Sequence, residues 1–128
     1  MLRRQPRNIR LATATAVFAA AAGMGIVNAP SAAASPEQCQ VGYFCVWQNS
    51  SYTGRFYAAP GSVPNIGAFM NDRTTSYWNR TTSWVTLYSD SNYRDCMTAV
   101  PAGGSAAAIA PNLNDRMTSF TISPRPTC

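Results

Sequence analysis

The sequence contains no histidine, no lysine and a single glutamate, Glu37. These absences remove the side chains that most often act as general bases, so a serine or cysteine nucleophile has no evident partner. A glycosidase pair would have to come from the aspartates alone. A structural zinc site is equally unfavourable, because no histidine is present and the cysteine spacings are not CxxC. We therefore expect that the protein is not an enzyme.

Acidic residues are absent from the beginning of the chain, where "MLRRQPRNIR" carries four arginines. The apolar run "LATATAVFAAAAGMGIV" and the small-residue segment "NAPSAAAS" follow. This order is typical of a secretory signal peptide with cleavage after Ala34. The alternative is a membrane anchor, but the run is short and rich in alanine, whereas a spanning helix needs ~20 strongly apolar residues. The sequence predicts a signal peptide over 1–34 and a secreted, extracellular protein over 35–128.

The basic charge of the whole chain belongs to the predicted signal peptide. Residues 35–128 have six arginines and five acids, a net charge of 6 − 5 = +1, so the sequence favours neither nucleic acid nor a membrane as a partner of the mature form. The remaining 128 − 34 = 94 residues are enough for one small domain, which we expect to be a monomer. The charged residues of this part are Arg55, Arg73, Arg80, Arg94, Arg116, Arg125, Glu37, Asp72, Asp90, Asp95 and Asp115.

Four cysteines lie in the predicted exported part, which indicates disulfide bonds in an oxidising compartment. Three pairings are formally possible. We favour Cys39–Cys45, which closes a turn through Gly42, together with Cys96–Cys128, which ties the C-terminal tail to the second half of the chain.

The hexapeptide "NDRTTS" (71–76) returns as "NDRMTS" (114–119), each time before an aromatic residue. Upstream of these segments the chain matches itself at an offset of forty-one, so that Trp47 meets Tyr88 and Tyr52 meets Tyr93. Two extra residues in the Gly/Ala-rich stretch 103–108 raise the offset to forty-three. An internal repeat of this length predicts two similar supersecondary units.

Each unit has the alternating pattern of β-strands. "FCVW" and "VTLY" place Phe44/Val46 and Val85/Leu87 on one face, with Cys45/Trp47 and Thr86/Tyr88 on the other. Turn-rich segments lead to the second strands "RFYAA" and "CMTAV", and a last strand follows each hexapeptide. Several short strands at regular spacing predict an all-β sandwich.

The aromatic spacing resembles the Greek-key motif of the βγ-crystallins. Trp47-x4-Tyr52-x-Gly54 matches the folded hairpin of that family, whereas Tyr88-x4-Tyr93-x-Asp95 departs from it at the glycine. Aspartate adopts the left-handed conformation at some cost. The resemblance implies a disulfide-stabilised, βγ-crystallin-like sandwich with Greek keys at about 39–80 and 84–123.

Both hexapeptides fit the calcium signature of the same family, Asn/Asp-Asn/Asp-x-x-Ser/Thr-Ser. The resemblance implies two weak calcium sites. The oxygen-bearing side chains of the hexapeptides suit calcium, which takes six to eight oxygen ligands. Each site would also borrow an oxygen from the hairpin of the other unit, near Asn49-Ser50 or Asp90-Ser91. The alternative is that both segments are only turns. The expected ligands are Asn71, Asp72, Arg73 and Thr75, and Asn114, Asp115, Arg116 and Thr118; Ser76 and Ser119 are expected to pin the hairpins.

More narrowly, the chain resembles secreted actinobacterial metalloproteinase inhibitors of peptidase inhibitor family 36. The resemblance rests on "CQVGYFCVW", with its Cys-x-x-Gly-x-x-Cys spacing, and on "NDR" before a Ser/Thr pair. It implies inhibition of a secreted zinc peptidase of the thermolysin type. A calcium-binding structural or envelope module without an enzyme target, and an antifungal toxin on the same fold, are the alternatives.

A candidate reactive bond lies at Cys96–Met97 in "RDCMT". An inhibitor presents a rigid segment, and the disulfide at Cys96 would supply rigidity beside the bond. An apolar residue after the bond suits the hydrophobic pocket of thermolysin-like enzymes. The alternative is that Met97, the repeat partner of Phe56, faces the core.

Overall fold

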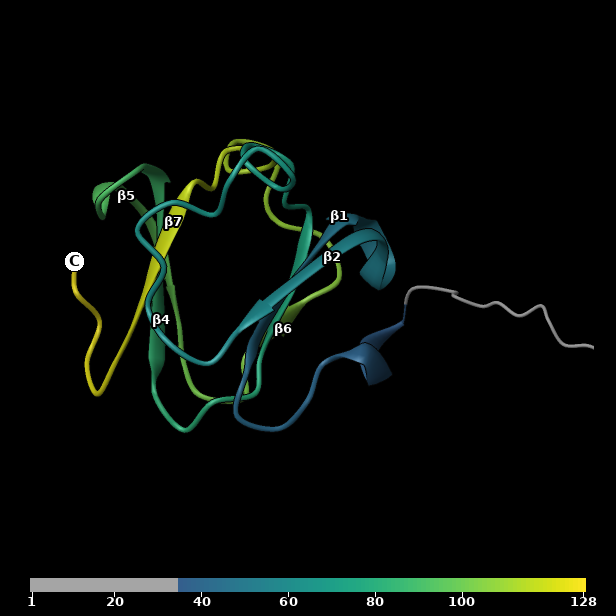
Figure 1. Cartoon of the computed structure of the whole chain (residues 1–128), viewed down its shortest axis with the longest axis horizontal. Helices are drawn as coiled ribbons and strands as arrows, with labels where there is room; N and C mark the ends of the chain where they lie inside the picture. The colour runs from purple at the N-terminus through teal and green to yellow at the C-terminus, as the bar shows by residue number, and fades with distance from the viewer. Residues whose placement is uncertain (1–34) are drawn as a thin grey trace, which may run out of the picture. The chain divides into compact units, whose positions relative to one another are not determined.

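Residues 35–128 are the part of the chain that the computed structural model describes, and the predicted signal peptide lies outside them. These residues form two β-sheets and two short 3-10 segments (Figure 1). No helix among them is long and apolar enough to cross a membrane. In chain order the elements are η3 (Pro36–Gln38), β1 (Phe44–Asn49), η4 (Ser50–Tyr52), β2 (Thr53–Ala59), β3 (Ser76–Asn79), β4 (Trp84–Asp90), β5 (Arg94–Val100), β6 (Ser105–Ala106) and β7 (Ser119–Ser123).

The two sheets have the strand orders β2-β1-β3-β6 and β5-β4-β7, and all their pairings are antiparallel. The first sheet consists of strands of the first unit, except that β6 comes from the second unit and pairs with β3. The second unit receives a segment in return, because Val63 exchanges backbone hydrogen bonds with Phe120 in β7. The two predicted units are therefore present, but each sheet is completed by the other unit. The all-β sandwich is confirmed.

The main core lies between the sheets and uses the alternation predicted for β1 and β4. Phe44 and Val46 meet Val85 and Leu87 there, all fully buried. The ring of Phe44 lies 4.9 Å from that of Phe120, in an edge-to-face arrangement that aromatic pairs favour. At the margin of this core, burial raises the pKa of Tyr57 and Tyr77 above 10.0, and the neighbouring Tyr52 adds to the shift at Tyr77. Met70, Ile66, Val100, Ala59 and Met117 complete the main core.

The outer face of the first sheet is covered by the N-terminal arm. Trp47 is fully buried there, and its indole Nε1 donates to Gln38 Oε1 at 2.9 Å. The disulfide between Cys39 and Cys45 fastens the arm to β1. A second small core forms around these residues, with Phe56 and Tyr52 packed against Trp47. The outward-facing residues of β1 are therefore not exposed to solvent, because the N-terminal arm covers them.

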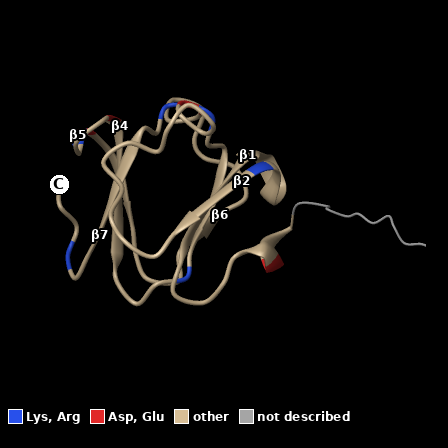
Figure 2. Cartoon of the chain, viewed as in Figure 1, with Lys and Arg blue, Asp and Glu red and all other residues tan. Residues whose placement is uncertain are grey.

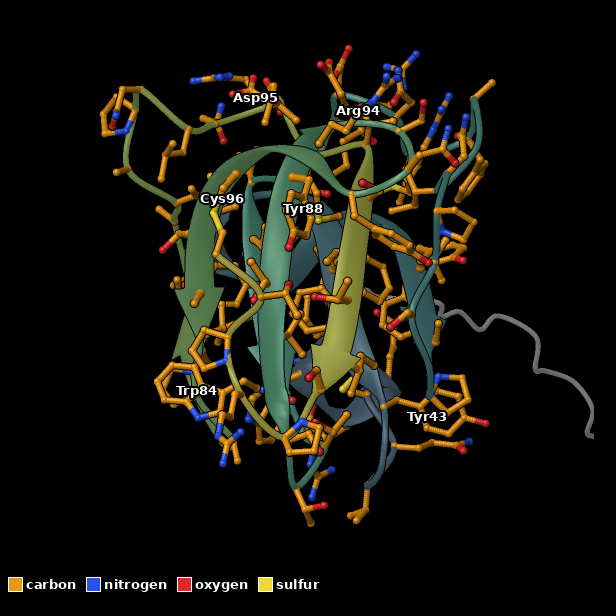
Figure 3. All side chains as sticks on the ribbon, turned by 90° about the vertical axis from the view of Figure 1, so that its left-hand side faces the viewer. Tyr43, Trp84, Tyr88, Arg94, Asp95 and Cys96 are labelled. Atoms are coloured by element: carbon orange, nitrogen blue, oxygen red, sulfur yellow. A yellow bond between two sulfur atoms is a disulfide. The ribbon has the colours of Figure 1, made fainter. Side chains whose placement is uncertain are left out.

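The outer face of the second sheet is covered by the C-terminal tail in the same way. Thr127 donates its backbone N–H to Thr86 Oγ1 at 3.1 Å and contacts the Tyr88 hydroxyl. Figure 3 shows Tyr88 on this face of the second sheet, with Cys96 and its disulfide to the left of it. That disulfide joins Cys96 to Cys128. Both cysteine pairs are those favoured from the sequence, and each fastens one terminal arm over one sheet.

The two hairpins have the same backbone although their sequences differ. Gly54 has φ +83°, and Asp95 at the equivalent position has φ +63°. Aspartate is thus accommodated in the left-handed region where the second unit lacks its glycine. Asp95 also accepts a hydrogen bond from the Ser89 hydroxyl and lies 3.7 Å from the guanidinium of Arg116. The bond from Ser89 joins the two strands of the second hairpin at this position.

Gly54→Ala is expected to destabilise the protein. Its new Cβ would lie 2.7 Å from Asn49 Nδ2 at a positive φ, so the free energy of unfolding should fall by about 1–3 kcal/mol. Gly61→Ala is the matched control, because its φ is not in the left-handed region and a Cβ would meet nothing within 4 Å. Thermal and urea unfolding would measure both variants; equal stabilities would show that Gly54 is not required by the hairpin.

Candidate functional site

The two hexapeptides meet at one end of the sandwich, in the loops at the top of Figure 1. The N–H of Asp72 donates to the carbonyl of Met117 at 3.1 Å, and the N–H of Asp115 donates to the carbonyl of Thr74 at 3.0 Å. Both aspartates have positive φ, 55° and 59°. Acidic and basic positions lie side by side in these loops (Figure 2). The repeat thus builds a pseudo-twofold pair of loops.

Each aspartate faces the threonine of the other hexapeptide. The hydroxyl of Thr118 lies 3.4 Å from Asp72 Oδ1, and that of Thr75 lies 3.2 Å from Asp115 Oδ1. The repeat predicts that Asp72 and Thr75 belong to one site and Asp115 and Thr118 to the other. The structure instead crosses these partners, because the two loops are packed against each other. Every candidate site is therefore composed of both repeats.

The first site is a cavity of about 470 Å³ that contains two carboxylates, Asp72 and Asp90. Asp90 comes from the end of β4, so the hairpin of the second unit contributes to this site, as the sequence analysis expected. Asn65 belongs to a loop with no repeat signal, and the sequence analysis missed it. The remaining residues that line the cavity are Gly67, Ala68, Asn71, Ser89, Ser91 and Thr118.

The second site is a smaller cavity of about 180 Å³ with a different charge. Asn49 occupies the position of Asp90, so an amide replaces the hairpin carboxylate. Asp115 and Asp72 supply the negative charge, and Arg73 adds a positive one nearby. Gln48 and Thr75 complete the lining. The second site is thus smaller and less negative than the first.

The oxygen atoms of these loops fit a hard cation. Asn71 Oδ1 and Asn114 Oδ1 are buried without a hydrogen-bond partner at equivalent positions of the repeat. An unpartnered buried oxygen is unusual. Asn71 lines the first cavity and could offer its oxygen to a cation there, whereas Asn114 lines neither cavity. Within residues 35–128 no group of three or more His, Cys, Asp or Glu side chains surrounds a possible ion, so neutral oxygens would have to complete either site. Such a donor set suits weakly bound calcium.

The guanidinium of Arg116 contacts two neighbouring groups at the surface. Its Nη1 donates to the carbonyl of Asn112 at 2.9 Å, and its Nη2 lies 3.7 Å from Asp95, where both side chains are about half exposed. A pair this exposed contributes little to stability. These contacts fix the position of the Arg116 guanidinium beside the second hairpin.

Ser76 and Ser119 connect the hexapeptides to the hairpins. The hydroxyl of Ser76 donates to the carbonyl of Asn49 at 2.7 Å and accepts from the N–H of Tyr52 at 3.2 Å. Ser119 makes the equivalent bonds to Asp90 and Tyr93, at 2.5 and 3.2 Å. Both serines are fully buried. These bonds fit the pinning role that the family resemblance implied.

Cys96 and Met97 lie in β5, at the open edge of the second sheet. The pairing of β4 with β5 shifts by one residue here, so that Tyr88 lies opposite Cys96 and Met97 is the extra residue of a bulge. Met97 is half-buried and packs against the main core, whereas its repeat partner Phe56 packs on the outer face. Cys96 is exposed. The site therefore offers an exposed disulfide and a strand edge, but its apolar side chain points inward.

The fold is that of a βγ-crystallin domain. A structure from work on the evolution of the eye-lens βγ-crystallin domain fold matches with a TM-score of 0.60 at 14% identity, over 74% of this chain and 93% of that one. The βγ-crystallin domain of Clostridium beijerinckii matches at 0.54 and 17%, over 64% and 98%. That of Flavobacterium johnsoniae matches at 0.53 and 20%, over 66% and 98%. Comparison with curated proteins found no match.

The sequence model of peptidase inhibitor family I36 matches residues 32–100, and the chain belongs to this family. The matched region contains the disulfide-closed turn, the first hexapeptide and β5. Membership supports peptidase inhibition as the function and, by family inference, a protein that is not an enzyme.

Removal of either pinning serine should destabilise the domain. In Ser76→Ala and Ser119→Ala a partly buried hairpin N–H and a carbonyl lose their partner, which should cost about 1–3 kcal/mol in each variant. Ser105→Ala is a control at an exposed position. Urea unfolding followed by tryptophan fluorescence would measure all three. Wild-type stability of both buried variants would contradict the pinning role.

Proposed function

We propose that the protein is exported, begins near Ser35 and inhibits a secreted zinc peptidase of the thermolysin type. Membership in peptidase inhibitor family I36 is the observation that carries this proposal. Two disulfide bonds within 94 residues are compatible with an oxidising compartment. The choice of a zinc enzyme rests on the resemblance of "CQVGYFCVW" and "NDR" to metalloproteinase inhibitors.

The Cys96–Met97 bond stays a candidate contact within this proposal. It is supported by the exposed disulfide partner and by the open edge of β5, to which an extended chain can add. Insertion of Met97 into an enzyme pocket would require that its side chain leave the main core. Inhibition through this bond therefore depends on a local rearrangement of the β5 bulge.

We also propose that the two hexapeptide sites bind calcium weakly. The first site would use the carboxylates of Asp72 and Asp90 with the Thr118 hydroxyl, and the second would use Asp115 with Thr75. Bound calcium would supply positive charge between loops of different repeats, which stabilises the folded state by mass action. The side-chain oxygens of Asn71 and Asn114 and the carbonyls of Arg73 and Arg116 are the further candidate ligands.

The first site should bind calcium more tightly than the second. Affinity in calcium sites rises with the number of charged ligands. Two carboxylates line each cavity, but Arg73 also lines the second and its positive charge opposes a cation there. The hairpin gives the first site the carboxylate of Asp90 and the second only the amide of Asn49. The same two sites would also serve the alternative function, a calcium-binding structural module, which needs no peptidase.

Calcium titration of variants should reveal the crossed composition of the sites. Asp72→Ala and Thr118→Val should both weaken the tighter site, by about tenfold or more for the lost carboxylate. Asp115→Ala and Thr75→Val should weaken the other site. Isothermal titration calorimetry on each variant would measure this. If Asp115→Ala and Thr118→Val weakened one and the same site, the crossed grouping would be wrong, because these two residues line different cavities. No binding at millimolar calcium would mean that the hexapeptides are only turns.

The purified protein should inhibit a thermolysin-type peptidase at near-equimolar concentration and leave secreted serine and cysteine peptidases active. Chelators also strip metal from the enzyme, so the role of calcium is better tested with the double variant Asp72→Ala/Asp115→Ala. Because the loss of calcium acts through stability, this variant should inhibit at low temperature and fail as it unfolds. Absence of inhibition across a panel of zinc peptidases would overturn the proposed target class.

A further inference from the structure

Residues Gln40–Tyr43 form a tight turn at the end of the sandwich away from the hexapeptides. The N–H of Tyr43 donates to the carbonyl of Gln40 at 3.2 Å, and Gly42 has φ +93°. A positive φ at the third position, without one at Val41, defines a type II turn, whose second residue has an extended backbone. Val41 thus stands at the corner of the turn.

Val41 is the most exposed large hydrophobic residue among those that the structure describes. Its exposed fraction is 75%, and the next is Phe69 with 55%. Phe69 is partly engaged, because the guanidinium of Arg55 lies 5.1 Å from its ring centroid. A Cβ built at the neighbouring Gly42 would meet nothing within 4 Å, so the space around the turn is open. The turn therefore projects an apolar side chain into solvent.

The turn is held rigidly from below. The disulfide Cys39–Cys45 closes it, and both of these cysteines are buried. The N–H of Gly42 donates to the carbonyl of Arg80 at 2.9 Å, and Arg80 Nη1 donates to the carbonyl of Cys39 at 2.8 Å. The Arg80 guanidinium also stacks over the Trp78 ring at 4.5 Å. A segment ordered before binding loses little conformational entropy when an enzyme binds it.

We propose that this turn is the contact with the peptidase, with Val41 in the hydrophobic pocket and the Gln40–Val41 peptide bond at the catalytic metal. The inference rests on the proposed function. The turn has the two features that made Cys96–Met97 a candidate: a disulfide close to the bond and an apolar residue after the bond. The turn also exposes its apolar side chain, whereas Met97 is half-buried and packs against the core.

The turn and the Cys96–Met97 bond lie in different regions of the molecule. Figure 3 shows Tyr43 at the lower right, and Cys96, Arg94 and Asp95 toward the upper end. An enzyme bound at the turn therefore leaves the hexapeptide loops free. The two contacts can be distinguished by separate variants, and calcium should affect inhibition only through stability.

The first experiment compares Val41→Asp, Val41→Leu and Phe69→Asp as inhibitors of a thermolysin-type enzyme. A buried charge in an apolar pocket should raise the inhibition constant of Val41→Asp by about a hundredfold or more. Val41→Leu should inhibit like the wild type, and Phe69→Asp is the control for loss of an exposed apolar side chain elsewhere. Circular dichroism and Tm of the two Val41 variants should match the wild type, since the side chain of Val41 is largely exposed. Wild-type inhibition by Val41→Asp would overturn the contact.

The second experiment locates the bond itself. Prolonged incubation with the enzyme should slowly hydrolyse the Gln40–Val41 amide, adding one water to give a carboxylate at Gln40 and a new amino terminus at Val41. The two pieces would stay joined by Cys39–Cys45 and separate only after reduction. N-terminal sequencing that instead found Met97 would overturn the inference and support the β5 contact. A wild-type protein that inhibits no zinc peptidase would overturn the proposed function and this contact with it.

Discussion

The reciprocal bonding between the two hexapeptide loops is the constraint on which the rest of the structure depends. Asp72 and Asp115 each donate a backbone N–H to the other loop, and the buried serines fasten each loop to its own hairpin. β6 completes the first sheet from the second unit, and Val63 extends the second sheet from the first unit. Neither repeat contains all the partners of its own sheet. The repeats are therefore two halves of one domain, and the candidate cation sites exist only where both halves meet.

The two halves keep one backbone while their chemistry diverges. Asn49 and Asp90 occupy equivalent positions and give their cavities different charge. Thr74 and Met117 are also equivalent and fully buried, but the Thr74 hydroxyl has no partner whereas Met117 fills its space with apolar atoms. Backbone hydrogen bonds set the fold and tolerate these exchanges. Side chains set the affinity of each site, so functional differences between the halves come from a few substitutions.

The two disulfides have matching architectural roles and different surroundings. Each fastens a terminal arm over the outer face of one sheet, which buries Trp47 on one side and Tyr88 on the other. Cys39–Cys45 is itself buried and supports a turn that projects outward. Cys96–Cys128 lies at the surface, beside the one-residue shift that turns Met97 inward. A disulfide therefore holds an exposed turn in the first half and the C-terminal tail in the second half.

The features that follow from spacing along the chain could be predicted from the sequence: the alternating strands, the hairpins and the repeat. Of the three possible cysteine pairings, the sequence favoured the one that the structure has. Three features depend on long-range packing and could not be predicted: Asp72 faces Thr118, β6 joins the first sheet, and Met97 packs against the core. Alternation has a period of two, so it predicts faces within one strand and says nothing about which distant segment packs against that face. A bulge of a single residue reverses the face, and its position is set by packing against the neighbouring strand.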